Sequence, residues 1–352
     1  MDTPRLWLRH EARGTERRAP IVPADARRLV EQGIELTVEE SPQRIFPLAD
    51  YTAVGCRTAP AGSWVRAPRD QYILGLKELP DEPAELTNRH IFFGHAYKGQ
   101  SGSAELLGRF AAGGGALLDL EYLVDEAGRR LAAFGYWAGY VGAALAVLHA
   151  RGVLGVPLQP SGKAELDAAL RDSRTTGEYR ALVVGALGRC GRGARDALEV
   201  AGLTPTCWDQ AETRELDRAA LLEHDLLVNT VLTTRPIPPF LRPEDLADPA
   251  RRLSVVCDVT CDVTSDCNVL PIYREITQWD RPVHALGPAG HPLDLIAIDN
   301  LPSLLPAEAS AAFSAELAPQ LLTLGDPAGP WQRCLTTYQQ ASLADALEGS
   351  HA

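Results

Sequence analysis

Short apolar runs alternate along the chain with segments of helical periodicity. In the first part of the chain, runs with the composition of buried strands occupy residues 4–9, 34–39, 72–76, 91–93 and 116–120. A helix over 24–32, which Gly33 ends, lies between the first two runs. A strand, a helix and a second strand in this order form a β-α-β unit, so this part is predicted to fold around a parallel sheet.

The same alternation continues in the second part of the chain. Further strands are predicted at residues 181–184, 225–229, 253–259 and 296–298. Helices are predicted over residues 131–147, 307–324 and 331–348, the last of them returning to the first domain, and the polar stretch 151–178 is predicted to be a connector. The fold class is therefore α/β.

The segment 181–210 has the pattern of a nucleotide-binding unit. Its apolar strand is followed by Gly185, Gly188 and Gly191 and then by a helix that is predicted to begin near Arg192. Glycine lets the backbone pass close to a pyrophosphate, and a helix N-terminus favours the negative charge of a phosphate. Asp209 ends the next short strand and can accept hydrogen bonds from the adenosine ribose, which favours NAD over NADP.

The spacing of these glycines is G-x-x-G-x-x-G, whereas the more common dinucleotide pattern is G-x-G-x-x-G. A glycine-rich loop of an α/β protein that binds no nucleotide therefore stays as the alternative. The preceding strand, the following helix and the acid at the expected distance favour the nucleotide.

Ionisable side chains follow three successive predicted strands of the first part. These are Lys77 and Glu78 after the run 72–76, His95 and Lys98 after 91–93, and Glu121 after 116–120. Since the carboxyl ends of parallel strands meet at one edge of a sheet, we expect these groups to gather there, where ligands bind. The alternative is a set of solvated loop charges with a structural histidine.

Composition and charge limit the class of protein. A chain of 352 residues with 45% hydrophobic and 23% charged residues is predicted to be globular, with two domains. The net charge of −12 argues against nucleic acid and against an anionic membrane surface as partners, and no apolar run is long enough to span a membrane. In such an acidic chain, clustered arginines and lysines are therefore stronger candidates for binding anionic substrates.

The seven cysteines show no disulfide framework, which predicts a reduced, cytoplasmic setting. Cys257, Cys261 and Cys267 lack the paired C-x-x-C spacing of a structural zinc site. No metal is therefore predicted, and buried thiols are the better interpretation.

Several motifs, spread over nearly the whole chain, resemble the NAD-dependent, lysine-forming saccharopine dehydrogenases of fungi, within the alanine dehydrogenase superfamily. The motifs are Pro60-Ala61-Gly62-Ser63-Trp64, Ala67-Pro68-Arg69-Asp70, Gly75-Leu76-Lys77-Glu78, His95-Ala96-Tyr97-Lys98, Ala132-Ala133-Phe134-Gly135, Gly185-Ala186-Leu187-Gly188-Arg189-Cys190-Gly191 and Asp299-Asn300-Leu301-Pro302-Ser303-Leu304-Leu305-Pro306.

The resemblance implies two Rossmann-like domains with parallel sheets and the active site in the cleft between them. Residues 1–133 plus 325–352 would form the substrate domain, and residues 134–324 the NAD-binding domain. It implies a reversible reaction in which NAD takes hydride from the carbon beside the secondary amine of saccharopine, and water then cleaves the imine to lysine and 2-oxoglutarate. It further implies a monomer that acts on a small-molecule substrate.

The resemblance also implies roles for individual residues. It assigns Lys77 as the acid–base group for imine hydrolysis and His95 as the group that serves the hydride step, and both steps need proton transfer near neutral pH. A guanidinium fork suits a carboxylate. The remaining substrate contacts that it implies are Arg18 and Arg130 for carboxylates, Gln100 and Phe134 for further contacts, and Glu78 and Glu121 near the amine.

On the cofactor side, the resemblance implies two groups of residues. Those at the nucleotide turn and the adenosine are Arg129, Gly185, Gly188, Arg189, Gly191, Asp209 and Thr213. Those at the nicotinamide end are Val259, Ile298, Asp299, Asn300 and Leu301, and Asp299 matches a partner of Lys98.

The chain also departs from the family pattern. Thr230 stands where the fungal enzymes have a second cysteine, so a disulfide from Cys190 is not expected, and Leu232 replaces a tyrosine near the adenosine. Two alternatives therefore stay open. One is an enzyme that acts on another lysine-derived secondary amine or hydrazine conjugate. The other is a non-catalytic NAD-binding regulator, which would not need to keep Lys77 and His95.

Overall fold

The apolar runs of the first part pair into one six-stranded parallel sheet with the order β3-β2-β1-β4-β5-β6. Leu6, Ile73 and Ile91 are fully buried, as expected for strands that are covered on both faces. The direction of the order reverses between β1 and β4. Ligands of such sheets bind at the carboxyl ends of the strands beside this reversal, so a ligand site is expected at the loops after β1 and β4.

The computed structural model describes residues 3–97, 102–173, 179–233, 235–263 and 265–349, and the chain forms two units. The first unit comprises Met1–Ala133 and Ala309–Ala352, and the second comprises Phe134–Glu308. The elements of the first unit are β1 (Arg5–Leu8), α1 (Pro23–Glu31), β2 (Glu35–Glu39), α2 (Leu48–Ala53), β3 (Arg57–Ala59), β4 (Gln71–Leu74), β5 (Arg89–Phe92), α3 (Ser103–Gly113), β6 (Ala116–Asp119), most of α9 (Pro306–Leu321) and α10 (Pro330–Gly349).

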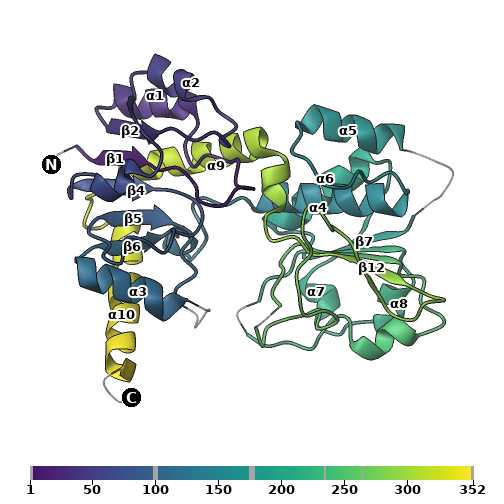
Figure 1. The fold of residues 1–352 in the computed structure, drawn as a ribbon. Coiled ribbons are helices and arrows are strands. Elements are labelled where there is room, and N and C mark those ends of the chain that lie inside the picture. Colours follow the sequence, from purple (N-terminus) through teal and green to yellow (C-terminus); the bar gives the residue numbers. More distant parts are fainter. Residues whose placement is uncertain (1–2, 98–101, 174–178, 234, 264, 350–352) are drawn as a thin grey trace. The chain divides into compact units, whose positions relative to one another are not determined.

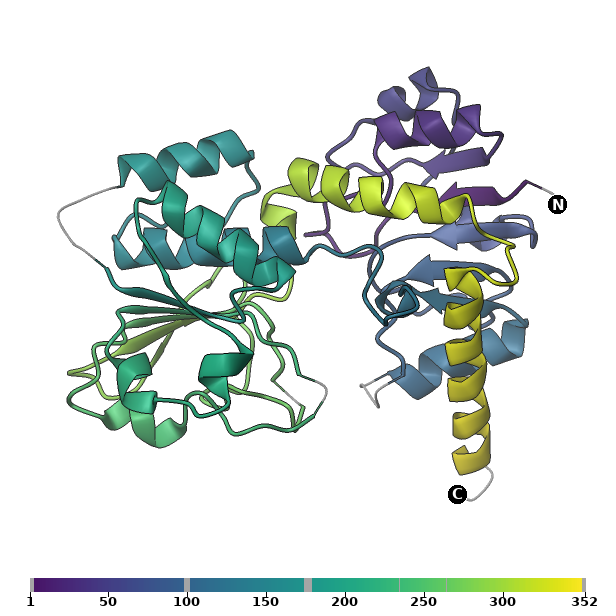
Figure 2. The ribbon, with the colours of Figure 1, turned by 180° about the vertical axis from the view of Figure 1, so that it is seen from behind.

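Helices cover the first sheet at both of its ends. Helices α1 and α2 pack on β2, whereas α3 and α10 pack on β6, as Figure 1 shows for the purple and yellow segments. The view from behind shows α9 and α10 against this unit (Figure 2). The last helix lies with the first unit, since α10 packs on β6 and α3.

The second unit holds another six-stranded sheet, with the order β11-β12-β10-β9-β7-β8. All its pairs are parallel except β11 with β12, which is antiparallel and was not expected from the sequence. Its elements are α4 (Gly135–Ala150), α5 (Lys163–Asp172), β7 (Ala181–Val184), α6 (Arg189–Val200), β8 (Thr206–Trp208), α7 (Gln210–Thr213), α8 (Arg218–Leu222), β9 (Leu226–Asn229), β10 (Val255–Asp258), β11 (His284–Leu286) and β12 (Leu293–Ile296).

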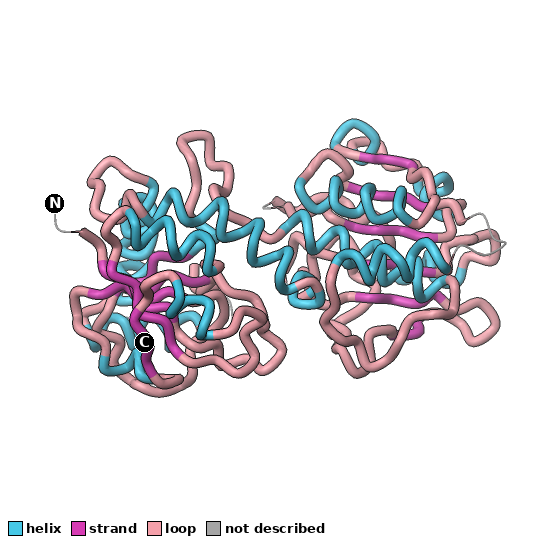
Figure 3. The backbone as a smooth tube through the Cα atoms, turned by 90° about the horizontal axis from the view of Figure 1, so that it is seen from above, coloured by secondary structure: helices cyan, strands magenta, loops and turns pink. Residues whose placement is uncertain are grey.

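Helices α4, α5 and α6 lie on one face of the second sheet, and α7 and α8 lie on the other (Figure 1). Figure 3 looks onto the first of these faces, with helices in front of the strands. Glycines allow α4 and α6 to approach closely. A Cβ on Gly139 would overlap the backbone of Cys190, and one on Gly193 would overlap the carbonyl oxygen of Tyr136. The contact between the two helices therefore depends on the absence of a side chain on each.

Three expectations from the sequence are wrong in detail. Residues 309–324 were expected in the second domain, but the structure places them with the first unit. Ser310 Oγ accepts the N–H of Ala19 at 2.9 Å, and Ser314 Oγ accepts the N–H of Val22 at 3.0 Å. These hydroxyls satisfy the backbone just before α1, and a sequence pattern carries no sign of such long-range bonds.

The second error concerns 151–178, which contains α5 instead of being only a connector. Asp167 binds this polar helix to α4, because its carboxylate accepts the hydroxyl of Tyr140. The same carboxylate accepts the ammonium of Lys163, one turn earlier in α5. The third concerns α6, which begins at Arg189 and not near Arg192, so Gly191 lies within the helix. In the part of the chain that the structure describes, no helix combines the length and apolar character needed to cross a bilayer.

Candidate active site

The loops after β1 and β4 lie together at the reversal of the first sheet. Lys77 follows β4, and the buried acid Glu16 lies in the loop after β1. Burial acts to raise the pKa of Glu16, but the Arg18 guanidinium, with its hydrogen bonds, and the charge of Lys77 lower it overall. Lys77 therefore lies within electrostatic reach of an ionised carboxylate that the sequence analysis did not single out.

Arg18 is buried, and its guanidinium forms a two-pronged contact with Glu16. Its Nε lies 2.8 Å from Glu16 Oε1, and its Nη2 lies 2.6 Å from Glu16 Oε2. Glu78 is tied to the same loop, since its Oε1 accepts Arg13 Nε at 2.8 Å. Burial acts to raise the pKa of Glu78, but the hydrogen bond and charge of Arg13, a backbone hydrogen bond and the charge of Lys77 together lower it overall.

The loop after β5 carries His95 beside this group. Pairing of the two strand ends continues past β4 and β5, because Phe93 N donates to Leu76 O at 3.2 Å. His95 has a φ of 49°, a left-handed conformation that is uncommon for a residue other than glycine and that often marks functional loops. Its side chain is 57% exposed, which leaves the imidazole open to a substrate.

Three further ionisable groups surround His95. Nδ1 of His95 lies 3.5 Å from Oε2 of Glu121, and Oε1 of Glu121 accepts Nη2 of Arg130 at 2.8 Å. The N–H of Glu121 donates to Asp119 Oδ1 at 2.8 Å, which begins the short helix η2 (Leu120–Tyr122). Burial and the charge of Glu121 raise the pKa of Asp119 to about 6, although His95 acts to lower it. Asp119 was missed because it ends an apolar run.

Arg129 and Phe134 are described, whereas two other expected residues lie outside the described part of the chain. Arg129 sits in an exposed turn of the first unit, where its Nε donates to Asp125 Oδ2 at 2.8 Å. Phe134 is the residue before α4, in the second unit. Gln100 and Lys98 fall in the range that the structure does not describe.

The turn after β7 has the geometry of a phosphate-binding loop. Gly185 has a φ of 84°, and a Cβ on Gly191 would overlap the carbonyl oxygen of Gly185, so the turn and α6 pack too closely for a side chain at either place. Gly188 precedes α6, whose N-terminus has no side-chain cap. These features fit a dinucleotide, because the backbone N–H groups of an uncapped helix start can bind a pyrophosphate.

Asp209 links this turn to the next strand. Its Oδ2 accepts the N–H of Leu187 at 2.9 Å, and its Oδ1 accepts the N–H of Gln210 at 2.9 Å, where α7 begins. Thr213 closes the same helix by donating its hydroxyl to the Asp209 carbonyl at 2.8 Å. On the other side, Thr230 donates its hydroxyl to the carbonyl of Val184 at 2.8 Å. No disulfide bond joins any of the seven cysteines, all of which lie in the described part of the chain.

The residues expected at the nicotinamide end lie after β10 and after β12. A Cβ on Gly142 of α4 would come within 2.9 Å of Val259 and within 3.2 Å of Leu301, so both side chains pack on this helix. Ile298 and Leu301 are buried, and their contribution to a nucleotide site would come from the backbone. Asn300 is also buried, whereas Asp299 is exposed.

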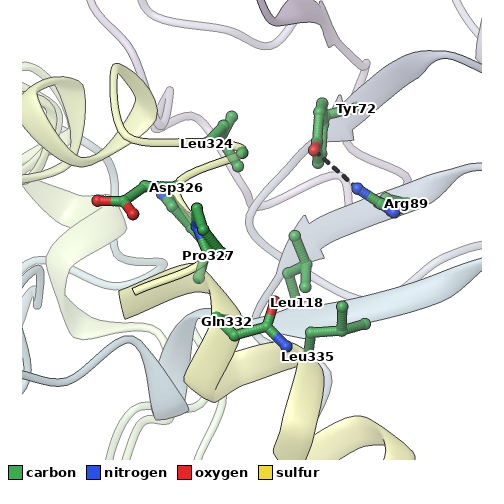
Figure 4. Close-up of a pocket in the computed structure, with 10 residues that line it drawn as sticks. Tyr72, Arg89, Leu118, Leu324, Asp326, Pro327, Gln332 and Leu335 are labelled. Atoms are coloured by element: carbon green, nitrogen blue, oxygen red, sulfur yellow. Dashed lines mark hydrogen bonds between the residues drawn. The ribbon is translucent and has the colours of Figure 1, made fainter. Parts of the chain in front are cut away.

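A separate cavity of about 170 Å³ lies in the first unit near the amino ends of β4 and β5 (Figure 4). Arg89 Nη1 donates to the hydroxyl of Tyr72 there at 3.0 Å, and Asp326 and Gln332 complete its polar lining. It contains none of the site residues expected from the sequence. Among the described residues, no group of three His, Cys, Asp or Glu side chains is arranged to hold a metal ion.

Comparison with known proteins gives consistent results. Residues 7–141 match the family described as alanine dehydrogenase/PNT, N-terminal domain. The saccharopine dehydrogenase [NAD(+), L-lysine-forming] of Emericella nidulans is 41% identical over 366 residues, which cover 97% of this chain and 98% of that protein. The enzyme of the same name from Schizosaccharomyces pombe is 42% identical, covering 96% of this chain and 98% of that protein.

Solved structures agree on the fold. An L-alanine dehydrogenase superposes with a TM-score of 0.67 at 17% identity and covers 97% of this chain and 94% of its own. At that identity the likeness supports the two-domain α/β architecture alone. The sequence relatives are much closer and extend over nearly the whole of both proteins. The chain therefore belongs to the NAD-dependent, L-lysine-forming saccharopine dehydrogenase family.

Proposed function

We propose that the protein catalyses the oxidative cleavage of saccharopine with NAD. The observation that carries this proposal is the similarity to saccharopine dehydrogenases over nearly the whole length of both chains. In the balanced reaction, saccharopine, NAD⁺ and water give L-lysine, 2-oxoglutarate, NADH and a proton. NAD supplies the hydride acceptor when bound, and the turn at Gly185–Gly191 with the N-terminus of α6 would hold its pyrophosphate.

Two proton transfers accompany the chemistry, and we assign them to two groups at neighbouring strand ends. The secondary amine must be deprotonated as hydride leaves the adjacent carbon, and His95 is assigned to accept that proton. Water must then add to the imine carbon, and Lys77 is assigned to move the protons of that step. Glu121 beside His95 and Glu16 beside Lys77 would balance the positive charge that each base acquires.

Saccharopine carries three carboxylates, and we assign two of them to Arg18 and Arg130. Each guanidinium already contacts one acid, Glu16 and Glu121 respectively, which holds its planar fork in a fixed orientation. A substrate carboxylate would bind to the N–H groups of these forks. Phe134 and Gln100 are proposed as further substrate contacts on the basis of the family pattern.

NADH formation with saccharopine tests the proposal. Lys77→Met and His95→Gln should each lower kcat by about 10²- to 10⁴-fold, the usual contribution of a general acid or base. His284→Gln, on the exposed strand β11, serves as the control and should keep wild-type kcat. If the protein turned over another lysine-derived amine but not saccharopine, the assignment of the substrate would be wrong. If it bound NAD but turned over no amine, the proposed catalytic activity would be refuted.

We further propose a monomer in a reducing, cytoplasmic setting. The lack of a disulfide bond among the seven cysteines, all of them described residues, supports such a compartment, since disulfides are rare there. Light scattering at several protein concentrations would test the oligomeric state, and fractionation of the producing cells would test the location.

A further inference from the structure

We propose that Arg9 and Glu11 form a clamp that fixes the backbone of Lys77 and so positions its ammonium group. The clamp is defined here as these two side chains together with the peptide groups that they bind. Both are positioning residues, because they act through Lys77 and not on the substrate. The inference rests on the proposed function only in that Lys77 is the group that moves protons.

The contacts of the clamp enclose Lys77 from both sides. Glu11 Oε1 accepts the N–H of Leu76 at 2.7 Å, and Glu11 Oε2 accepts the N–H of Lys77 at 3.0 Å. Arg9 donates through Nη2 to the carbonyl oxygen of Lys77, and through Nη1 to Glu11 Oε2 at 3.2 Å. One ion pair therefore binds both the donor and the acceptor of the Lys77 backbone.

The burial of this pair argues that it has a purpose beyond stability. Arg9 is 1% exposed and Glu11 is 4% exposed. Removing two charges from water costs several kcal/mol per ion, and the attraction between them often does no more than offset that cost. Apolar side chains of similar size would avoid that cost, but they could not bind the two N–H groups and the carbonyl beyond the end of β4.

Gly75 supplies independent evidence for the arrangement. A Cβ at this position would lie 2.5 Å from Arg9 Cζ and 2.6 Å from Arg9 Nη2, so the guanidinium reaches Lys77 only because residue 75 has no side chain. Arg9 also lies over the ring of Phe92, with Cζ 5.7 Å from its centroid. The space under the end of β4 is thus shaped to admit one guanidinium in one orientation.

The loop that carries the clamp is itself held in place. Gln43 Nε2 donates to the carbonyl of Glu11 at 2.6 Å, and Arg44 Nη2 donates to the carbonyl of Arg9 at 3.3 Å. Arg9 N donates to Leu74 O at 3.0 Å, which extends the pairing of β1 with β4. With the backbone of Lys77 fixed, the position of its ammonium group depends on its side-chain torsions alone. An error of about 1 Å in a catalytic group can cost about 10²-fold in rate.

A double-mutant cycle tests whether the pair acts through Lys77. Glu11→Gln places an amide N–H₂ against donors and should lower kcat for saccharopine by about 10- to 100-fold in the wild-type background. In the Lys77→Met background the same change should alter the residual kcat by less than about twofold. Saccharopine KM and NADH affinity should stay close to wild type. Equal losses in both backgrounds would overturn the clamp.

Two glycine variants provide the control. Gly75→Ala displaces the Arg9 guanidinium without changing a charge. Like Glu11→Gln, it should lower kcat in the wild-type background and change kcat little in the Lys77→Met background. Gly108→Ala in α3 adds a methyl that meets nothing within 4 Å and should keep wild-type kcat. If Glu11→Gln does not fold, the cycle is run with Gly75→Ala or with Arg9→Lys, which keeps the charge but lacks the fork.

Hydrogen exchange separates this inference from the proposed function. In Glu11→Gln, the amides of Leu76 and Lys77 should exchange at least about tenfold faster, because each loses a carboxylate acceptor. Amides of β10 in the second unit should be unchanged. Unchanged exchange at Leu76 and Lys77 refutes the clamp whatever the substrate is. A wild-type enzyme that does not turn over saccharopine but shows this exchange pattern refutes the proposed function alone.

Discussion

His90 is a histidine that is buried in its neutral form in the first unit. Its burial leads us to predict that the free energy of unfolding falls in acid. The residue is 1% exposed and lies in β5, with its ring centroid 5.3 Å from those of both Trp64 and Phe110. Both ring nitrogens are buried with no hydrogen-bond partner among the described residues. Burial, followed by the charges of Arg9 and Arg109, lowers the pKa of His90 from 6.5 to about 3.

The sign and size of the effect follow from that pKa. Below about pH 6.5 the unfolded chain takes up a proton at this position, whereas the folded protein does not until about pH 3. The contribution to stability is therefore complete above pH 6.5 and is lost as the pH falls. Between about pH 7.5 and about pH 5 the free energy of unfolding should decrease by about 2 kcal/mol through His90 alone.

The measurement compares wild type with His90→Phe in urea at several pH values. Hydrogen exchange of peptides from β4 and β5 follows the first unit separately from the second. Asp119 works in the opposite direction, because its pKa is raised to about 6 and its protonation stabilises the fold as the pH falls. The relevant quantity is therefore the difference between the two proteins, since other titrating groups cancel.

His90→Phe should lose about 2 kcal/mol less than wild type over that pH range, whatever its stability at neutral pH. His284→Phe, an exposed change on β11, should follow the wild-type profile. Parallel profiles for wild type and His90→Phe would refute the reasoning, because they would mean that the imidazole is protonated equally in the folded and unfolded states.

Further predictions concern the second unit. Gly193→Ala should lower the free energy of unfolding of the second unit, measured in urea, by about 1–3 kcal/mol, since the new methyl overlaps the Tyr136 carbonyl where α6 meets α4. Asp209→Ser should raise kcat/KM for NADP relative to NAD by about tenfold, because the variant removes a negative charge that would face a 2′-phosphate. Oxidation with a thiol-specific disulfide-forming reagent should not link Cys190 to position 230, where a threonine stands, and mass spectrometry of the intact chain would check this.

The strands were predictable because burial on both faces leaves an uninterrupted apolar run. The run 181–184 coincides with β7, and the α/β fold with two sheets of mainly parallel strands is confirmed. The start of α6 was placed three residues late because glycines such as Gly191 are typical of loops. Here Gly191 lies within a helix that packs against the turn before it, which is a tertiary contact and not a local preference.

The helix α5 and the domain boundary within α9 were harder to predict from the sequence, because they too depend on tertiary contacts. Asp167 ties α5 to α4, and Ser314 ties α9 to the segment before α1, through partners far away in the sequence. At the site, the rule that ligands gather at strand ends pointed to Lys77 and His95. The acids that surround them, such as Glu16, resemble ordinary loop charges in the sequence, and only their burial distinguishes them.

The arrangement of charge explains how an acidic chain can offer a site for an anionic substrate. With a net charge of −12, a substrate with three carboxylates would be repelled at long range unless cations were gathered locally. The first unit gathers them, and it also pairs each with an acid: Arg18 with Glu16, and Arg130 with Glu121.

These acids have two consequences that a bare cationic site would lack. They hold the guanidinium forks in place before the substrate arrives, which lowers the ordering cost of binding. In the proposed reaction they would also remain beside Lys77 and His95 after a carboxylate has bound, so that a proton taken up there would still meet negative charge. In the proposed site, pairs of opposite charge would therefore bind the substrate carboxylates with little change in the net charge of the protein around them.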